Sequence, residues 1–162
     1  MTVWAIFERG SDRLRPMNTL CGIDEAGRGC LAGPLVVAGV VLRGDIAGLM
    51  DSKILSPKKR EALFDVILKE ALHHHIVIIT PEEIDHTGIS GAMRRALTEI
   101  REAVSAATYL FDGNTPFGVE RITCQVKADR DIPAVSAASI LAKVTKDREL
   151  LRLGADYPHY GF

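Results

Sequence analysis

The sequence predicts an α/β protein, because apolar β-branched runs alternate with segments of helical periodicity. The segment Leu35–Leu42 (LVVAGVVL) is almost wholly apolar and rich in valine, which is typical of a strand buried on both faces. Its single glycine, Gly39, is the one residue there that disfavours a strand. Shorter runs of the same kind predict four further strands, over residues 20–24, 76–79, 109–112 and 121–126.

Three helices are predicted between and after these strands. Ser56 and Pro57 combine a good N-cap residue with a proline at the first helical position, so we expect a helix over residues 57–72. A second amphipathic helix is indicated by apolar residues at helical spacing, namely Met93, Leu97, Ile100 and Val104. Pro133 opens an alanine-rich segment that we expect to remain helical to about residue 153.

Length and composition indicate one globular domain. The chain has 162 residues, of which 47% are hydrophobic and 25% are charged. The net charge of −1 gives no global basic signal for nucleic acid. The longest uncharged apolar stretch, residues 30–42, is interrupted by Pro34 and is shorter than the ~20 residues of a membrane span. We expect a solvated tail over residues 1–16 and a folded domain over residues 17–162. The three cysteines form no Cys-x-x-Cys motif, which favours a reducing, cytoplasmic location.

Carboxylates at the ends of apolar runs are the main candidates for chemistry. Asp24 and Glu25 close the first run and lead into a Gly-Arg-Gly turn at residues 27–29. Because successive side chains of a strand point to opposite faces, both acids serve one site only if the backbone bends just after Asp24. Asp112 ends another run, and Asp129 precedes the last helix. Such oxygen ligands suit hard cations such as Mg²⁺ or Mn²⁺.

Each acid also has an ordinary structural interpretation. Asp24 and Glu25 could be turn residues at the end of a strand. Asp112 is followed by glycine, which is a common turn pair, and Asp129 could stabilise a helix N-terminus. The consecutive histidines at residues 73–75, expected near a helix end, are poor metal candidates because adjacent side chains do not converge on one ion.

The wider pattern resembles ribonuclease HII, the bacterial type 2 ribonuclease H. The resemblance rests on GIDEAGRG (22–29), DSK (51–53), FDGN (111–114), KAD (127–129), SAASILAKVTKD (136–147) and the aromatic residues between 157 and 162. It implies an RNase H-like fold, in which a mixed central β-sheet is flanked by helices. It also implies that four acids are the catalytic, metal-binding residues, with Mn²⁺ or Mg²⁺ as the cofactor: Asp24, Glu25, Asp112 and Asp129.

The resemblance further implies an endoribonuclease that hydrolyses the RNA strand of RNA–DNA hybrids. The same family cuts 5′ of ribonucleotides embedded in duplex DNA and leaves 5′-phosphate ends. In such a mechanism two ions about 3.5–4 Å apart activate a water and stabilise the leaving oxygen. The substrate must be recognised by its 2′-hydroxyl, and the family uses Gly27, Arg28 and Gly29 for this purpose. Glycines allow close approach to a sugar, but they could equally make only the turn, with Arg28 paired to a neighbouring acid. We expect a monomer with no membrane association.

Phosphate groups are expected to bind a local basic surface. Residues 121–152 hold seven Lys/Arg against four acids, which gives +3 in a chain of net charge −1. Lys53 and Lys143 are the best single candidates because both lie in the family motifs, and Ser136 and Ser139 are expected to add hydroxyl contacts. The alternative is that these charges form an ordinary solvated helix face.

Two other functions are compatible with the residues. The family's sequence normally continues beyond the last aromatic residues into a segment whose tyrosine stacks near the RNA–DNA junction. The first alternative is therefore a catalytically weak or inactive hybrid-binding form that lacks the C-terminal segment. The second alternative is a different phosphotransferase that uses carboxylates and metal ions.

Overall fold

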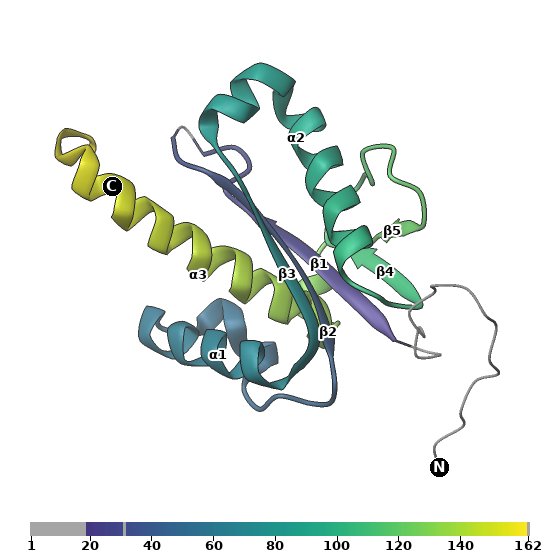
Figure 1. Cartoon of the computed structure of the whole chain (residues 1–162). Helices are drawn as coiled ribbons and strands as arrows, with labels where there is room; N and C mark the ends of the chain where they lie inside the picture. The colour runs from purple at the N-terminus through teal and green to yellow at the C-terminus, as the bar shows by residue number, and fades with distance from the viewer. Residues whose placement is uncertain (1–18, 31, 162) are drawn as a thin grey trace, which may run out of the picture.

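A mixed five-stranded sheet forms the centre of the molecule (Figure 1). The computed structural model describes residues 19–30 and 32–161, without the side chains of residues 51–53 and 160. The predicted tail therefore lies outside the described residues. The strand order is β3-β2-β1-β4-β5, and β1 runs antiparallel to β2 but parallel to β4. The strands are β1 (Leu20–Ala26), β2 (Leu35–Leu42), β3 (Ala71–Ile79), β4 (Thr108–Phe111) and β5 (Ile122–Cys124).

Helices cover both faces of this sheet, so the predicted α/β class and RNase H-like architecture are confirmed (Figure 1). One face carries α1 (Pro57–Glu70) and α3 (Pro133–Asp156), and the other carries α2 (Pro81–Ala103). Three short 3-10 helices complete the described elements: η1 (Leu49–Ile54), η2 (Ala128–Arg130) and η3 (Pro158–Tyr160). No helix in the described part of the chain is both long and apolar enough to cross a bilayer.

The first predicted helix begins correctly but ends earlier than expected. Ser56 caps α1, and its hydroxyl accepts a hydrogen bond from the amide of Lys59. The helix ends at Glu70, and β3 begins at the next residue without a loop. The expected helix end at residue 72 and strand start at residue 76 are therefore wrong, because pairing with β2 extends the strand back to Ala71. The three histidines lie within β3 rather than at a helix end, and residues 51–54 belong to η1.

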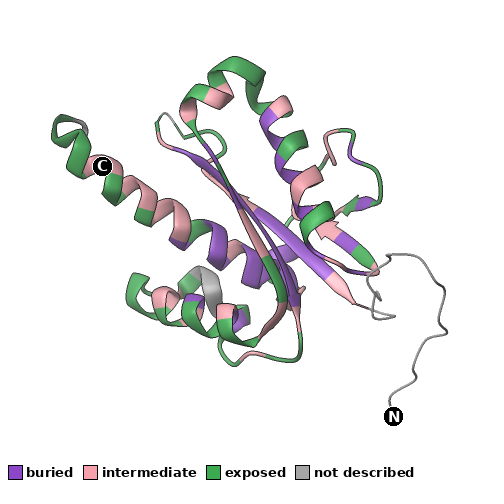
Figure 2. Cartoon of the chain, in the orientation of Figure 1, coloured by how far each residue is buried: buried purple, intermediate pink, exposed green. Residues whose placement is uncertain are grey.

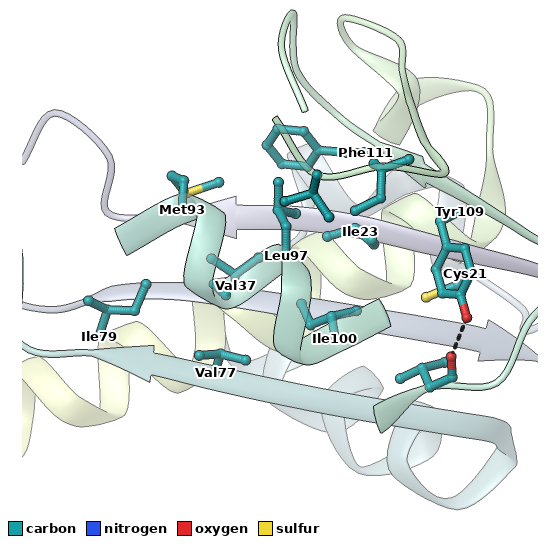
Figure 3. Packing of buried hydrophobic residues seen from close by; sticks show 14 of the residues in the cluster. Cys21, Ile23, Val37, Val77, Ile79, Met93, Leu97, Ile100, Tyr109 and Phe111 are labelled. Atoms are coloured by element: carbon teal, nitrogen blue, oxygen red, sulfur yellow. Dashed lines mark hydrogen bonds between the residues drawn. The ribbon is translucent and has the colours of Figure 1, made fainter. Parts of the chain in front are cut away.

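The core consists of two layers separated by the sheet (Figure 2). Alternate residues of β2 enter opposite layers: Val37 packs toward α2, and Val36 packs toward α1 and α3. This confirms the prediction of a strand buried on both faces. On the α2 side, the hydroxyl of Tyr109 donates a hydrogen bond to the carbonyl of Val104 at 2.6 Å (Figure 3). Gly39 is explained by close packing, since a Cβ there would lie 2.4 Å from Cγ2 of Ile100.

Gly22 brings α3 into direct backbone contact with β1. A Cβ built at Gly22 would lie 2.3 Å from both the carbonyl carbon of Ala134 and the amide nitrogen of Val135. Both neighbours are backbone atoms, so no side-chain rotation relieves the overlap. The first turn of α3 therefore lies against β1 only because residue 22 has no side chain. This contact places α3 beside Asp24, which is two residues further along the same face of β1.

We predict that Gly22→Ala lowers the free energy of unfolding by at least about 3 kcal/mol, because α3 must move away from β1. Urea denaturation followed by circular dichroism measures the change. Gly44→Ala is the matched control, because a Cβ at Gly44 meets no atom within 4 Å. An unchanged stability in Gly22→Ala would show that α3 does not depend on this contact.

Candidate active site

Three carboxylates converge at the ends of neighbouring strands. Asp24 lies near the end of β1, and Asp112 follows β4, the parallel neighbour of β1. The amide of Asp112 donates a hydrogen bond to the carbonyl of Ile23 at 2.9 Å, which continues the ladder between the two strands. Asp129 comes from η2, which follows β5. One carboxylate oxygen from each of Asp24, Asp112 and Asp129 lies within 4.8 Å of the others. We call these three residues the acidic cluster.

Backbone amides fix the orientation of Asp112. The amide of Lys127 donates to Oδ1 of Asp112 at 2.8 Å, and the amide of Asp129 donates to Oδ2 at 3.1 Å. Both donors belong to the turn that begins η2, and Lys127 has the left-handed backbone conformation there, with φ of 62°. The predicted Lys-Ala-Asp motif thus supplies two hydrogen bonds to one acid and the carboxylate of another.

Asp24 is held in an environment that opposes its negative charge. The residue is 9% exposed. Burial raises the pKa of Asp24 to about 8, and the nearby charges of Glu25 and Asp112 add to this effect. Hydrogen bonds from the Glu25 amide and the Ser139 side chain act in the opposite direction on this pKa. A cation between the carboxylates would favour their ionised form and so oppose this shift.

Glu25 lies on a regular strand, without the backbone bend that a site shared with Asp24 was expected to need. The backbone does not bend after Asp24, because β1 continues to Ala26 and Glu25 pairs regularly with Val37 of β2. The side chain of Glu25 therefore leaves the opposite face of β1 and is not part of the acidic cluster. Burial and the charge of Asp112 raise the pKa of Glu25, and the guanidinium of Arg28 lowers it. Arg28 Nε lies 3.2 Å from Glu25 Oε1, whereas Glu25 Oε2 is buried with no hydrogen-bond partner.

Arg28 of the Gly-Arg-Gly turn contacts both Glu25 and the loop after β4. Gly27 and Gly29 both have positive φ, of 104° and 83°, so the turn requires their freedom. A Cβ at Gly27 would lie 2.5 Å from the carbonyl oxygen of Pro34, whereas one at Gly29 would meet nothing within 4 Å. The guanidinium of Arg28 also lies 5.9 Å from the ring centroid of Phe117. Both parts of the turn-forming alternative are therefore present: the glycines make the turn, and Arg28 pairs with an acid.

The predicted phosphate contacts occupy very different positions. Lys143 is exposed on α3, one turn after Ser139. It therefore lies on the side of the helix that carries Ser139, whose side chain hydrogen bonds to Asp24. Ser136 is fully buried, and its hydroxyl donates to the carbonyl of Leu49 at 2.7 Å. That position does not fit the expected contact with a substrate; Ser136 instead attaches η1 to α3. The side chain of Lys53 lies outside the described residues.

Cysteine and histidine side chains outside the site differ in their surroundings. Cys30 is exposed, whereas Cys21 is fully buried. His75 pairs with Glu99 of α2 at 2.8 Å.

The donor set fits a divalent cation. One oxygen from each of three carboxylates lies within 4.8 Å of the others. Glu25, whose pKa the charge of Asp112 helps to raise, has a buried oxygen without a hydrogen-bond partner. Like charges held this close together are unfavourable without a compensating positive charge; burial first, and then the neighbouring acids, raise the pKa of Asp24. Hard oxygen donors of this kind are those preferred by Mg²⁺ and Mn²⁺. The residues of the acidic cluster therefore fit a divalent metal ion.

Sequence reasoning did not assign the groups that orient the acids. The amide of Lys127 leaves no signal in a sequence, because any residue except proline supplies an N–H. Ser139 was expected to contact substrate, whereas its side chain hydrogen bonds to Asp24. The spacing of Ser139 from Pro133 predicts a place in the first turns of α3. Only the close approach of α3 to β1 shows that Ser139 meets Asp24.

Comparison with known proteins gives a consistent result. The family model described as ribonuclease HII matches residues 21–162. The chain is 55% identical over 143 residues to ribonuclease HII of Sulfurovum sp. (strain NBC37-1), covering 88% of this chain and 76% of that protein. It is 53% identical over 148 residues to ribonuclease HII of Aliarcobacter butzleri (strain RM4018), covering 90% of this chain and 77% of that protein.

Solved structures agree with the sequence relatives. The ribonuclease HII of Archaeoglobus fulgidus, solved as a complex with PCNA, matches with a TM-score of 0.77 at 33% identity, covering 86% of this chain and 78% of that chain. The ribonuclease H2 of Pyrococcus horikoshii OT3 matches with a TM-score of 0.75 at 29% identity, covering 88% of this chain and 78% of that chain. With the fold, the acidic cluster and the family model in agreement, the chain belongs to the ribonuclease HII family of endoribonucleases.

Proposed function

We propose that this protein hydrolyses the RNA strand of RNA–DNA hybrids and cuts 5′ of ribonucleotides embedded in duplex DNA. The observation that carries the proposal is the acidic cluster, in which acids from three separate segments meet within 4.8 Å. A hybrid-binding protein without catalysis would have no need to gather negative charge where a polyanion binds. Membership of the ribonuclease HII family supports the choice of substrate.

Four acids would hold the metal ions in this proposal: Asp24, Glu25, Asp112 and Asp129. When bound, divalent ions lower the pKa of a water to generate the nucleophile and neutralise charge on the reacting phosphate. The chain's own groups align the acids for this task and oppose, in part, the effect of burial on their ionisation. Two backbone amides hold Asp112, Ser139 hydrogen bonds to Asp24, and Arg28 compensates part of the burial of Glu25. No histidine is needed as a general base.

The Gly-Arg-Gly turn would recognise the ribose. Gly29 supports this role because the space beside its Cα is open, so a sugar can approach the backbone there. Main-chain amides and carbonyls can both donate to and accept from a 2′-hydroxyl. Arg28 is 38% exposed and lies between Glu25 and Phe117, so it can position the turn while it pairs with the acid.

Phosphates further along the substrate would be held by lysines. Lys143 is exposed on the side of α3 that carries Ser139, so it lies on the helix next to the site. We retain Lys53 as a second candidate from the family motif. Such contacts hold the duplex by its charge and do not read its bases. The protein would act as a monomer, with Mg²⁺ or Mn²⁺ as its cation.

We predict that Asp112→Asn binds hybrid duplex but cleaves it at least about 100-fold more slowly. Asparagine has only one side-chain oxygen, so the amides of Lys127 and Asp129 lose one acceptor, and a metal ligand loses its charge. Single-turnover cleavage in Mg²⁺ and in Mn²⁺ measures the rate. Asp45→Asn, an exposed acid beyond the other end of β1, is the matched control. Wild-type cleavage by Asp112→Asn would contradict the assignment.

We predict that cleavage depends on the 2′-hydroxyl and not on the base. Replacing the target ribose by deoxyribose in an otherwise identical duplex should abolish cleavage, whereas changing its base should alter the rate little. Gel analysis of end-labelled duplexes with a single ribonucleotide provides the measurement. Cleavage of an all-DNA duplex at a comparable rate would refute ribose recognition, and tight binding of hybrid with no cleavage in either metal would favour the non-catalytic alternative.

We predict that, without divalent ions, stability falls as the pH rises from about 4 toward 8. The pKa of Asp24 is about 8 in the folded protein against 3.8 as its ordinary value, so the folded state binds the extra proton in this window. Each unit of this difference corresponds to about 1.4 kcal/mol. Asp24→Asn should flatten the dependence and raise Tm at pH 8. Added Mn²⁺ should raise the Tm of the wild type more than that of the variant, and equal responses to Mn²⁺ would argue against a metal site at Asp24.

A further inference from the structure

Three residues other than glycine adopt the left-handed backbone conformation in the described part of the chain. They are Phe117 (φ 51°), Arg121 (φ 65°) and Lys127 (φ 62°), and all lie between β4 and η2. This conformation is disfavoured for L-residues that carry a Cβ, whereas glycine adopts it readily. Glycine would therefore be less strained at each of these three positions.

At Lys127 the left-handed conformation serves the hydrogen bonds that orient Asp112. It allows the turn before η2 to direct the amides of Lys127 and Asp129 toward the carboxylate of Asp112. Glycine would supply the same amide with less strain. The side chain of Lys127 is exposed, and no ion pair involving it occurs among the described residues, although Asp112 and Asp129 are adjacent. Among the described residues, the lysine side chain therefore forms no hydrogen bond or ion pair that would account for its presence here.

We propose that Lys127 binds a backbone phosphate of the nucleic acid strand held at the acidic cluster, and that the left-handed strain is retained for this contact. The inference rests on the proposed function. A polyanion approaching clustered carboxylates is repelled, so a cation at the edge of the cluster favours its binding. The backbone of Lys127 lies at that edge, since its amide is 2.8 Å from Oδ1 of Asp112, and its side chain is exposed. An ammonium on a flexible stem suits a phosphate as a point charge.

Arg121 provides a matched control within the same segment: although it begins the basic stretch over residues 121–152, we place it outside the phosphate contacts because it lies away from the acidic cluster. It has nearly the same φ, is exposed and carries the same charge. Arg121 precedes β5 and Lys127 follows β5, so the two residues flank opposite ends of the strand. Because β5 is parallel to β4, the end nearest Arg121 is the one away from Asp112. Replacing either residue by glycine removes one positive charge and relieves the same backbone strain, but only one change lies beside the cluster.

The test compares Lys127→Gly, Arg121→Gly and Lys127→Arg in hybrid cleavage with Mn²⁺ over a range of salt concentrations. Lys127→Gly should raise KM about three- to tenfold with little change in kcat, and the slope of log KM against log salt should fall by about 0.7–0.9. Lys127→Arg should restore both values, and Arg121→Gly should leave them at the wild-type level. The Tm of Lys127→Gly should stay at the wild-type value or rise by up to about 4 °C, because strain is relieved while the unfolded chain gains freedom.

The outcomes separate this inference from the proposed function. Equal KM values and salt slopes in Lys127→Gly and Arg121→Gly, with an active wild type, would overturn the role of Lys127 alone. A fall in Tm confined to Lys127→Gly would show that the side chain stabilises the fold, which also overturns the inference. A wild type that cleaves no hybrid in Mn²⁺ or Mg²⁺ would overturn the proposed function, and the inference with it.

Discussion

The contact between Gly22 and the first turn of α3 is the constraint on which the site depends. Backbone atoms of Ala134 and Val135 occupy the space where any other residue would place its Cβ. This contact holds the start of α3 against β1, so that Ser139 lies beside Asp24. The same face of β1 therefore carries Gly22, whose lack of a side chain allows α3 to pack closely, and Asp24, which belongs to the acidic cluster. Hydrophobic packing on both faces of the sheet makes this arrangement rigid.

Carboxylates are gathered in a partly buried part of the structure, where negative charge is unfavourable. This concentration of charge is the functional property of the site. Burial and neighbouring acids raise the pKa of both Asp24 and Glu25, so the metal-free protein is destabilised near neutral pH. Amides that donate to Asp112 and the guanidinium beside Glu25 compensate part of this repulsion. A divalent cation would compensate the rest, which links metal binding to stability. The same repulsion explains why a substrate that is itself a polyanion needs cations at the edge of the cluster.

Most of the fold could be predicted from periodicity, but the geometry of the site could not. The valine-rich β2 and the capped start of α1 follow from local sequence, and both are confirmed. The direct passage from α1 into β3 is decided by pairing with β2, which is a long-range interaction. Adjacent acids on β1 were expected to need a backbone bend; instead, Glu25 extends from the face opposite Asp24 and is stabilised by Arg28. Ser136 follows the family motif in sequence, yet it is buried, because burial depends on which side of α3 meets η1.

The most direct test of this account is a crystal structure of the wild-type protein in Mn²⁺, with the ions located by anomalous scattering. We predict anomalous density among the carboxylates of Asp24, Asp112 and Asp129. The surrounding carboxylates should keep the positions that β1, β4 and η2 give them. Density confined to the histidines of β3, or no ordered ion at the cluster at saturating Mn²⁺, would contradict the claim that the fold assembles these acids to bind metal.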